Sequence, residues 1–344
     1  MTLIPLTPSQ LAERQQALGA WLSDRSGSPV SLRPVSGDAS FRRYFRFQHA
    51  GSSHVAMDAP PSHEDCRPFA ALADAYLAVG VQVPTIHARD LEQGFLWLRD
   101  FGDQLLLPLL SDVGQARNLY RRALAVVPAI QQVTATADGE LPLYDEAMLR
   151  REMALFSDWL LPRQLGYQLD ADGHALWQQL TDLLVANALE QPQVGVHRDF
   201  HSRNLMLLVD GGIGVIDFQD AVVGPITYDA VSLLRDCYVA WPDELVYAEL
   251  EGFRQLLLAA GRSDVGDAAQ FRRWFDLMGM QRHLKAAGIF ARLLHRDGKP
   301  GYIADIPRTV GYILSVGSHY PELQPVIDWL KADIWPLIET KCGG

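Results

Sequence analysis

One segment of this chain reads Val196-His197-Arg198-Asp199-Phe200-His201-Ser202-Arg203-Asn204-Leu205, and a later one reads Ile216-Asp217-Phe218. Between them, the Gly211-Gly212 pair separates two apolar runs, residues 205–209 and 213–216, a pattern typical of a β-hairpin. Asn204 therefore enters the first hairpin strand, and Asp217 follows the second. Amide and carboxylate oxygens suit a hard cation such as Mg²⁺, which keeps some water and phosphate ligands. The two segments predict a magnesium site held by Asn204 and Asp217.

The spacing H-x-D-x-x-x-x-N, followed by an apolar strand ending in Asp-Phe, is the catalytic-loop arrangement of protein-kinase-type phosphoryl transfer. In that arrangement the Asp of the loop accepts the proton of the attacking hydroxyl, so Asp199 is the expected base. His197, two residues earlier, is expected to support the loop through hydrogen bonds. The chain has only three Asn, and an accidental match to the loop pattern has a chance of roughly one in a hundred or less.

Residues 1–99 are expected to form a small lobe of mostly antiparallel sheet that binds the nucleotide. The predicted strands are residues 30–35, 41–47, 54–59, 85–89 and 94–98. In the second of them, Phe41, Phe45 and Phe47 alternate with Arg42, Tyr44 and Arg46, the period of two that is typical of a half-buried strand. A helix is predicted at residues 64–79, where Gly80 ends it, and another at residues 7–23, where Pro8 lies in the first turn.

Residues 100–344 are expected to form a larger, mainly helical lobe with the catalytic loop, the metal ligands, the acceptor site and the β-hairpin. The predicted helices are residues 113–133 with a kink at Pro128, 146–160, 175–189, 243–260, 271–295 and 323–338. The predicted fold class is therefore α+β, with the two lobes of a protein-kinase-like fold. Asp100-Phe101-Gly102 is interpreted as a hinge, because the metal-binding Asp of kinases follows the catalytic loop. Backbone groups near Leu98 are expected to meet the adenine there.

These residues resemble the aminoglycoside-phosphotransferase family of the protein-kinase-like fold over essentially the whole chain. That family includes antibiotic, choline, homoserine and sugar kinases. Four segments resemble more closely its bacterial anomeric kinases of N-acetylmuramate and N-acetylglucosamine, which act in peptidoglycan recycling of the cell wall: residues 37–44, 57–61, 281–285 and 289–293. The resemblance implies ATP and Mg²⁺ as cofactors, an amino sugar as the small-molecule substrate, and phosphorylation of its anomeric hydroxyl.

The strand that carries a phosphate-binding Lys in kinases departs from the family pattern here. Asp58 stands where V-A-I-K places the Lys, and no Lys occurs before Lys285. Neutralisation of the phosphates then falls to the arginines beside the turn at residues 37–40, because a guanidinium can bind phosphate oxygens bidentately. The arginines concerned are Arg42, Arg43 and Arg46. With Leu98, the expected nucleotide-binding residues are Ser40, Arg42 and Arg43; a solvated strand face is the alternative for the arginines.

The charge of the C-terminal helical region indicates the kind of acceptor. Residues 271–311 contain eight Arg or Lys against three Asp, within a chain of net charge −11. The resemblance places the acceptor site in this region. A polycationic aminoglycoside is unfavourable there, whereas an acceptor with a carboxylate, such as the lactyl group of N-acetylmuramate, is favoured. Arg282 and His283 are the expected acceptor contacts, although some of these charges are ordinary exposed helix face.

Composition excludes several other classes of protein. The acidic balance argues against nucleic acid as a main partner, since phosphate backbones require a basic surface. The three cysteines lie far apart and form no C-x-x-C pair, so neither a disulfide framework nor a thiolate zinc site is indicated. No apolar run is long enough to cross a membrane, and no signal-peptide pattern is present. A cytoplasmic enzyme is therefore expected, and the sequence implies no particular protein partner.

Two other functions remain open from the sequence. The chain could be an aminoglycoside kinase or another small-alcohol kinase of the choline or homoserine type. The missing strand Lys is the one feature that suggests a non-catalytic, nucleotide-binding pseudokinase. Against that alternative, Asp199, Asn204 and Asp217 are all present, whereas a degenerate pseudokinase usually loses one of the three.

Overall fold

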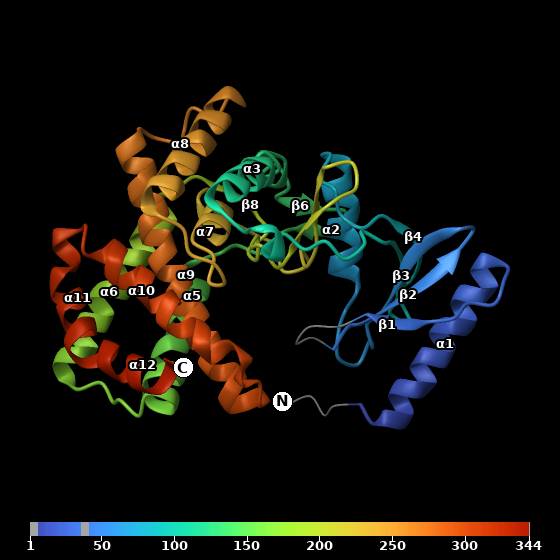
Figure 1. Ribbon diagram of the computed structural model, residues 1–344, viewed down its shortest axis with the longest axis horizontal. Helices are drawn as coiled ribbons and strands as arrows, with labels where there is room; N and C mark the ends of the chain where they lie inside the picture. Colours follow the sequence, from blue (N-terminus) through green and yellow to red (C-terminus); the bar gives the residue numbers. More distant parts are fainter. Residues whose placement is uncertain (1–5, 36–40, 344) are drawn as a thin grey trace. The chain divides into compact units, whose positions relative to one another are not determined.

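The computed structural model describes residues 6–35 and 41–343, and the chain divides into two compact units (Figure 1). The first unit contains the residues up to Gln104 together with Ala135–Glu140 and Met206–Asp220. The second contains Leu105–Thr134, Leu141–Leu205 and the residues from Ala221 onward. An antiparallel sheet in one unit and a larger set of helices in the other confirm the α+β class. The lobe boundary expected between residues 99 and 100 stays a prediction.

The first unit is built on a five-stranded antiparallel sheet. Its strands follow the order β1 (Arg33–Val35), β2 (Arg43–His49), β3 (Ser52–Asp58), β5 (Phe95–Arg99) and β4 (Ile86–Asp90). The alternation predicted for β2 is confirmed, because Phe45 and Phe47 are buried. They share a core cluster with Leu18 and Leu22 of α1 (Pro8–Ser26), the helix that packs on this sheet (Figure 1).

The first unit contains two further elements, a helix and a hairpin. Helix α2 (Arg67–Ala78) begins later than predicted, with Pro68 in its first turn, where proline costs no hydrogen bond. Strands β9 (Leu205–Leu207) and β10 (Ile213–Val215) form the predicted hairpin, and the Gly211 of its turn has a φ of 84°. A bridge from Gln82 to Gly214 joins β10 to the N-terminal part of the unit.

In the second unit, the helices surround the 30-residue helix α9 (Ala268–Asp297). Helices α5 (Glu146–Leu155), α6 (Ala171–Glu190), α7 (Tyr228–Leu234) and α10 (Ile306–Gly317) pack against it (Figure 1). The other helices are α3 (Val113–Leu124), α4 (Val127–Ile130), α8 (Asp243–Ala259), α11 (Gln324–Trp329) and α12 (Trp335–Cys342). Strand β8 (Gln193–Val196) pairs antiparallel with β11 (Val222–Pro225) and leads into the catalytic loop. In the first unit, β6 (Ala135–Thr136) pairs with β7 (Gly139–Glu140).

Several predicted helices differ from those observed. The predicted helix at residues 113–133 is two helices, α3 and α4, because Pro128 lies in the first turn of a new helix. The predicted helix at residues 146–160 changes after Leu155 into a π-helical segment, Phe156–Gln164. Helices α7 and α10 have no counterpart in the prediction. In the part of the chain that the structure describes, no helix has both the length and the apolar character needed to span a bilayer.

Helix α9 approaches the end of α5 so closely that Gly288 has no room for a side chain. A Cβ there would lie 2.3 Å from the carbonyl carbon of Leu155 and 2.5 Å from the amide nitrogen of Phe156. Backbone atoms cannot move aside as the end of a flexible side chain can. This contact therefore fixes how α9 passes the α5 end.

We expect Gly288→Ala to lower the free energy of unfolding by about 1–3 kcal/mol, as overpacking of a dense core does. Gly252→Ala in α8 is the matched control, because a Cβ at Gly252 meets nothing within 4 Å. That control should gain about 0.5–1 kcal/mol from the better helix propensity of Ala. Urea denaturation of both variants measures the difference. Equal stabilities for Gly288→Ala and the unmodified protein would contradict the close contact.

Candidate active site

The catalytic loop, residues 197–204, is anchored at both ends by buried carboxylates. Asp229 of α7 accepts the backbone N–H groups of His197 at 2.8 Å and of Arg198 at 3.0 Å. Asp236 accepts the backbone N–H of Ser202 at 3.0 Å. Burial raises the pKa of Asp229 to about 7, although both backbone hydrogen bonds oppose the rise. The loop thus depends on two acidic groups that lie outside its own sequence.

Asp229, the first of these two carboxylates, holds a residue with a strained backbone conformation. Arg198 has a φ of 79°, a left-handed conformation that costs energy for a residue with a side chain. Asp217 has a φ of 63° and is strained in the same way. Such strain persists only where the surroundings enforce it, and it gathers at functional sites. Arg198 precedes the expected base Asp199, and Asp217 is itself the predicted metal ligand.

Asp199 lies in a loop that is internally braced. Its backbone N–H donates a hydrogen bond to Nδ1 of His197 at 3.2 Å. Its backbone carbonyl accepts a hydrogen bond from Nδ2 of Asn204 at 3.0 Å. Because the Asn204 amide nitrogen is turned to this carbonyl, its amide oxygen is turned the other way. The hydrogen bond from the loop to His197 is the kind of support that the sequence predicts for this histidine.

The charge of Asp199 is set by the cations around it. Burial raises the pKa of this carboxyl, but neighbouring side chains, among them the cations Lys285, Arg282 and Arg198, together outweigh burial and lower the pKa to about 2. Asp199 is therefore ionised at neutral pH and can accept a hydrogen bond from an incoming hydroxyl. A group with so low a pKa works mainly by orienting that hydroxyl and taking its proton late in the transfer.

A buried polar cluster carries part of this positive charge. Lys285 of α9 is 7% exposed, and its Nζ lies 3.2 Å from Glu152 of α5 and 3.1 Å from the hydroxyl of Tyr228. Glu152 also pairs with Arg198 and accepts a hydrogen bond from Tyr144. Burial raises the pKa of Glu152, but Lys285 and Arg198 outweigh burial and lower it, so this carboxylate is charged as well. The cluster joins α5, α7 and α9 to the catalytic loop.

The two predicted acceptor contacts have different surroundings. Arg282 is 6% exposed, donates to Sγ of Cys237 at 3.6 Å and contributes to the low pKa of Asp199. His283 is bonded through Nε2 to the carbonyl of Arg235 at 2.9 Å and stacks on Tyr312. Burial lowers the pKa of His283 to about 3, so its ring is neutral and donates to that carbonyl. Arg282 thus acts on the base through its charge, while His283 is engaged within the helical core.

Asp217 is exposed and follows β10 at the end of the hairpin. The next residue, Phe218, is buried against Phe69 and Tyr76 of α2, with ring centroids 4.7 and 5.7 Å away. Oδ1 of Asp217 accepts a hydrogen bond from the Gln219 side chain at 2.9 Å. Phe218 therefore anchors the backbone that carries Asp217, which explains why Asp-Phe occurs as a pair.

The side chains that are present suit magnesium better than a transition metal. Among residues 6–35 and 41–343, no three His, Cys, Asp or Glu side chains are grouped as metal ligands. Mg²⁺ needs only one or two protein oxygens besides phosphate and water. Asn204, which precedes β9, and Asp217, which follows β10, offer one amide and one carboxyl group of that kind.

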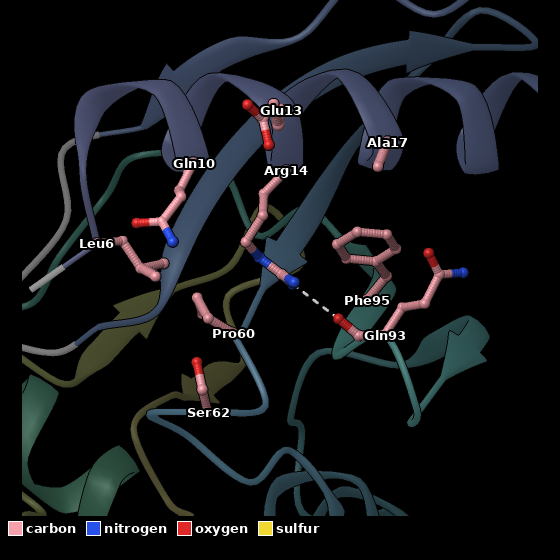
Figure 2. Close-up of a pocket in the computed structure, with 9 residues that line it drawn as sticks. All are labelled: Leu6, Gln10, Glu13, Arg14, Ala17, Pro60, Ser62, Gln93 and Phe95. Atoms are coloured by element: carbon pink, nitrogen blue, oxygen red, sulfur yellow. Dashed lines mark hydrogen bonds between the residues drawn. The ribbon is translucent and has the colours of Figure 1, made fainter. Parts of the chain in front are cut away.

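The carboxylate at the expected Lys position, Asp58, is fully buried between two arginines. Arg43 pairs with one of its oxygens and Arg14 of α1 with the other. Figure 2 shows Arg14 reaching from α1 to the backbone carbonyl of Gln93, which accepts its hydrogen bond at 2.7 Å. This contact lies in a shallow groove of about 350 Å³ between α1 and Phe95. Asp58 therefore ties α1 to the sheet.

The other two arginines of this region also have carboxylate partners. Arg46 pairs with Asp100 at 2.7 Å and Asp103 at 2.9 Å. Arg42 pairs with Glu64 at 3.0 Å. Burial raises the pKa of Tyr44 to about 12, and the charges of Arg42, Asp217 and Glu64 also act on it. Arg42, one of the arginines expected to bind the phosphates, and Asp217, the predicted metal ligand, therefore both lie close enough to Tyr44 to affect its pKa.

Two further predicted nucleotide contacts are less defined by the structure. Leu98 lies within β5, buried between β3 and β4, and leads to Asp100. Asp100 accepts hydrogen bonds from Arg46 and from Ser53. Ser40 and the turn at residues 37–40 lie outside the described residues.

Comparison with known proteins supplies the family. The family model described as "Phosphotransferase enzyme family" (APH) matches residues 31–263. This chain belongs to that family. An N-acetylmuramate/N-acetylglucosamine kinase of Pseudomonas aeruginosa is 50% identical over 295 residues, which cover 86% of each protein. A kinase of the same name from Neisseria meningitidis is 41% identical over 317 residues, covering 91% of this chain and 94% of the relative.

Solved structures of the family's fold are also similar, at much lower identity. Plasmodium vivax ethanolamine kinase has a TM-score of 0.61 at 10% identity and covers 94% of this chain and 93% of its own. Choline kinase LicA from Streptococcus pneumoniae has a TM-score of 0.63 at 11% identity, covering 88% and 99%. The aminoglycoside phosphotransferase APH(4)-Ia, in a ternary complex with ADP and hygromycin B, has a TM-score of 0.56 at 16% identity, covering 87% and 97%. They confirm the kinase-like fold.

The sequence did not reveal the residues that hold the loop and its charges: Glu152, Tyr228, Asp229 and Asp236. One signal was available in the sequence. Asp229 is a lone acid in the otherwise largely apolar run at residues 226–234, where burial of a charge requires a specific partner. Nothing local marks Glu152, because it lies on a helix with ordinary charged neighbours.

We expect Lys285→Met to raise the pKa of Asp199, because a cation that favours the ionised form is removed. The acid limb of kcat/KM should then move to higher pH by roughly one unit or more. Lys285→Arg keeps the charge and should leave that limb near its original position. The pH dependence of turnover measures both. The same displacement in the two variants would show that packing, and not charge, sets the limb.

Proposed function

We propose that this chain is an ATP-dependent kinase that phosphorylates the anomeric hydroxyl of N-acetylmuramate and N-acetylglucosamine in peptidoglycan recycling. The main support for this reaction is the catalytic loop, in which Asp199 is ionised and its backbone carbonyl accepts a hydrogen bond from Asn204. The choice of substrate rests on relatives of that name, which match most of the chain. The use of cytoplasmic ATP favours a cytoplasmic location, and neither nucleic acid nor a membrane is a proposed partner.

In this proposal, Asp199 accepts a hydrogen bond from the anomeric hydroxyl and takes its proton as the bond to phosphorus forms. ATP would supply the phosphoryl group, with ADP as the leaving group, and Mg²⁺ would neutralise the charge that develops on the phosphates. Asn204 and Asp217 would hold the metal, and His197 would keep the loop in place. No covalent intermediate on the protein is required, because orientation and charge neutralisation supply most of the rate.

For the nucleotide, we propose that Arg42 carries the role of the missing strand Lys. Its pairing with Glu64 supports this proposal, since kinases hold their strand Lys with a Glu in the same way. Arg43 is engaged by the buried Asp58, so its contribution to the phosphates is expected to be smaller. Ser40 and the backbone near Leu98 complete the proposed nucleotide site.

For the acceptor, we propose that the positive charge of α9 favours an anionic sugar. Arg282 supplies part of that charge, and His283 fixes the part of α9 that bears it. This sign is unfavourable for a cationic aminoglycoside. An ADP-release assay with amino sugars, aminoglycosides and choline tests the assignment directly. Turnover of N-acetylmuramate and N-acetylglucosamine supports it, and turnover of an aminoglycoside or choline alone would contradict it.

We expect Asp199→Asn to lower kcat by about 10²–10⁴, because the proton acceptor is lost while the shape is nearly retained. Its affinity for nucleotide should change little.

Asp217→Ala should weaken the binding of Mg-ATP as well as turnover, because a ligand of the metal is lost. Nucleotide titration and steady-state kinetics separate the two effects. Near-normal turnover in Asp199→Asn would rule out Asp199 as the base.

The two neighbouring arginines should separate nucleotide binding from stability. We expect Arg42→Ala to raise the KM for ATP by roughly ten- to a hundredfold, the value of a charge-assisted hydrogen bond. Arg43→Ala should instead lower the melting temperature, because it removes one partner of the buried Asp58. Kinetics and thermal denaturation are measured on both variants. A larger effect on the ATP KM in Arg43→Ala would reverse the assignment.

A further inference from the structure

Three aromatic side chains of the second unit form a cluster beside the catalytic loop. Phe290 of α9 stacks on Tyr302, with ring centroids 5.7 Å apart, and contacts Tyr238 at 6.3 Å. The Tyr238 ring also contacts the ring of His201 in the loop, with the centroids 5.4 Å apart and the planes at 79°. His201 lies two residues after Asp199, so the cluster contacts the segment of the loop that carries the proposed base.

Arg203, on the catalytic loop, lies over this cluster. Its guanidinium carbon is 3.6 Å from the centroid of the Tyr238 ring and 5.8 Å from that of Tyr302. The Arg203 side chain is exposed, unlike its neighbours Ser202 and Asn204. Stacking on aromatic rings fixes the plane of a guanidinium and leaves its N–H donors at the edge available to a planar anion. Arg203 is thus an oriented cation one residue away from the proposed metal ligand Asn204.

Arg203 differs from the other cations around the loop in its partners. Arg198 and Lys285 pair with Glu152, and Arg308 pairs with Asp305. Arg282 is buried against Cys237. Across residues 6–35 and 41–343, no carboxylate lies within ion-pair distance of Arg203. In a chain with an excess of acidic residues, such an arginine beside the loop points to an anion supplied from outside.

We propose that Arg203 binds the carboxylate of the lactyl group of N-acetylmuramate and so distinguishes this sugar from N-acetylglucosamine. The inference rests on the proposed function and deepens it by naming the residue that reads the acceptor's charge. Tyr238 orients Arg203 for this contact. Arg282 has a different role, because it is buried and acts through its charge on Asp199. The specificity of the acceptor site therefore comes from the loop that carries the base.

The test removes the charge from each side of the proposed pair in turn. Arg203→Met keeps an unbranched side chain that can lie on Tyr238 but has no charge. The matched change in the substrate is the carboxamide of N-acetylmuramate, which keeps the shape of the lactyl group. Arg262→Met is the control protein, because Arg262 pairs with Asp264 between α8 and α9 and has no part in the site. Values of kcat/KM are measured for both sugars and the carboxamide, together with the KM for ATP.

Arg203→Met is expected to lower kcat/KM for N-acetylmuramate by about ten- to thirtyfold, the range of a charge-assisted hydrogen bond with some exposure. Its values for N-acetylglucosamine and its KM for ATP should change by less than about twofold. The unmodified protein should show a similar loss on the carboxamide, and that substrate should be indifferent to Arg203→Met. Such non-additivity would identify a direct contact between the two groups.

Four results would overturn the proposal. Equal losses on the two sugars would give Arg203 a structural role only, and a matching rise in the ATP KM would place it at the nucleotide. Full activity of Arg203→Met on N-acetylmuramate would exclude the contact between Arg203 and the lactyl carboxylate. The proposed function would still hold in that case, provided that the unmodified protein phosphorylates both sugars. If the unmodified protein phosphorylates neither sugar, the proposed function fails and this inference fails with it.

Discussion

The pairing of Glu152 with Lys285 and Arg198 is the interaction on which the site depends. Buried charges are costly unless they are paired and hydrogen-bonded, and loss of one partner leaves an uncompensated charge worth about 3–5 kcal/mol. Glu152 comes from α5, Lys285 from α9 and Arg198 from the catalytic loop, so satisfying these charges fixes three separate segments together. The same cations keep Asp199 ionised. The same buried charges thus hold the helices of the second unit together and keep the proposed base ionised.

The parts of the fold that the sequence predicted are those with a local signal. The alternation in β2, the hairpin at Gly211 and helix α1 with Pro8 in its first turn each follow from short-range periodicity or turn chemistry, and each is confirmed. The family and the kinase-like fold could be read from the loop spacing, because that spacing reflects chemistry and not packing. Comparison with the phosphotransferase family confirms both.

The parts that the sequence did not predict depend on contacts between distant residues. Helix α7 is buried on all sides and therefore lacks an amphipathic period, so its Asp229 could not be placed beside the loop. Asp58 was identified as a departure from the family pattern, yet only the structure shows that Arg14 of α1 helps to neutralise it. Arg203 looked like any loop arginine until Tyr238 and Tyr302 were seen beneath it. In each case the missing information was the partner, which lies at least 31 residues away.

The position of the phosphoryl group on the product tests the proposed reaction most directly. The unmodified protein is incubated with ATP, Mg²⁺ and N-acetylmuramate, and the product is examined by two-dimensional ¹H–³¹P NMR. We expect a phosphorus nucleus coupled to the anomeric proton of the sugar, since Asp199 is proposed to accept the proton of the anomeric hydroxyl. Coupling to the protons of another carbon, or a sugar that stays unmodified, would contradict it.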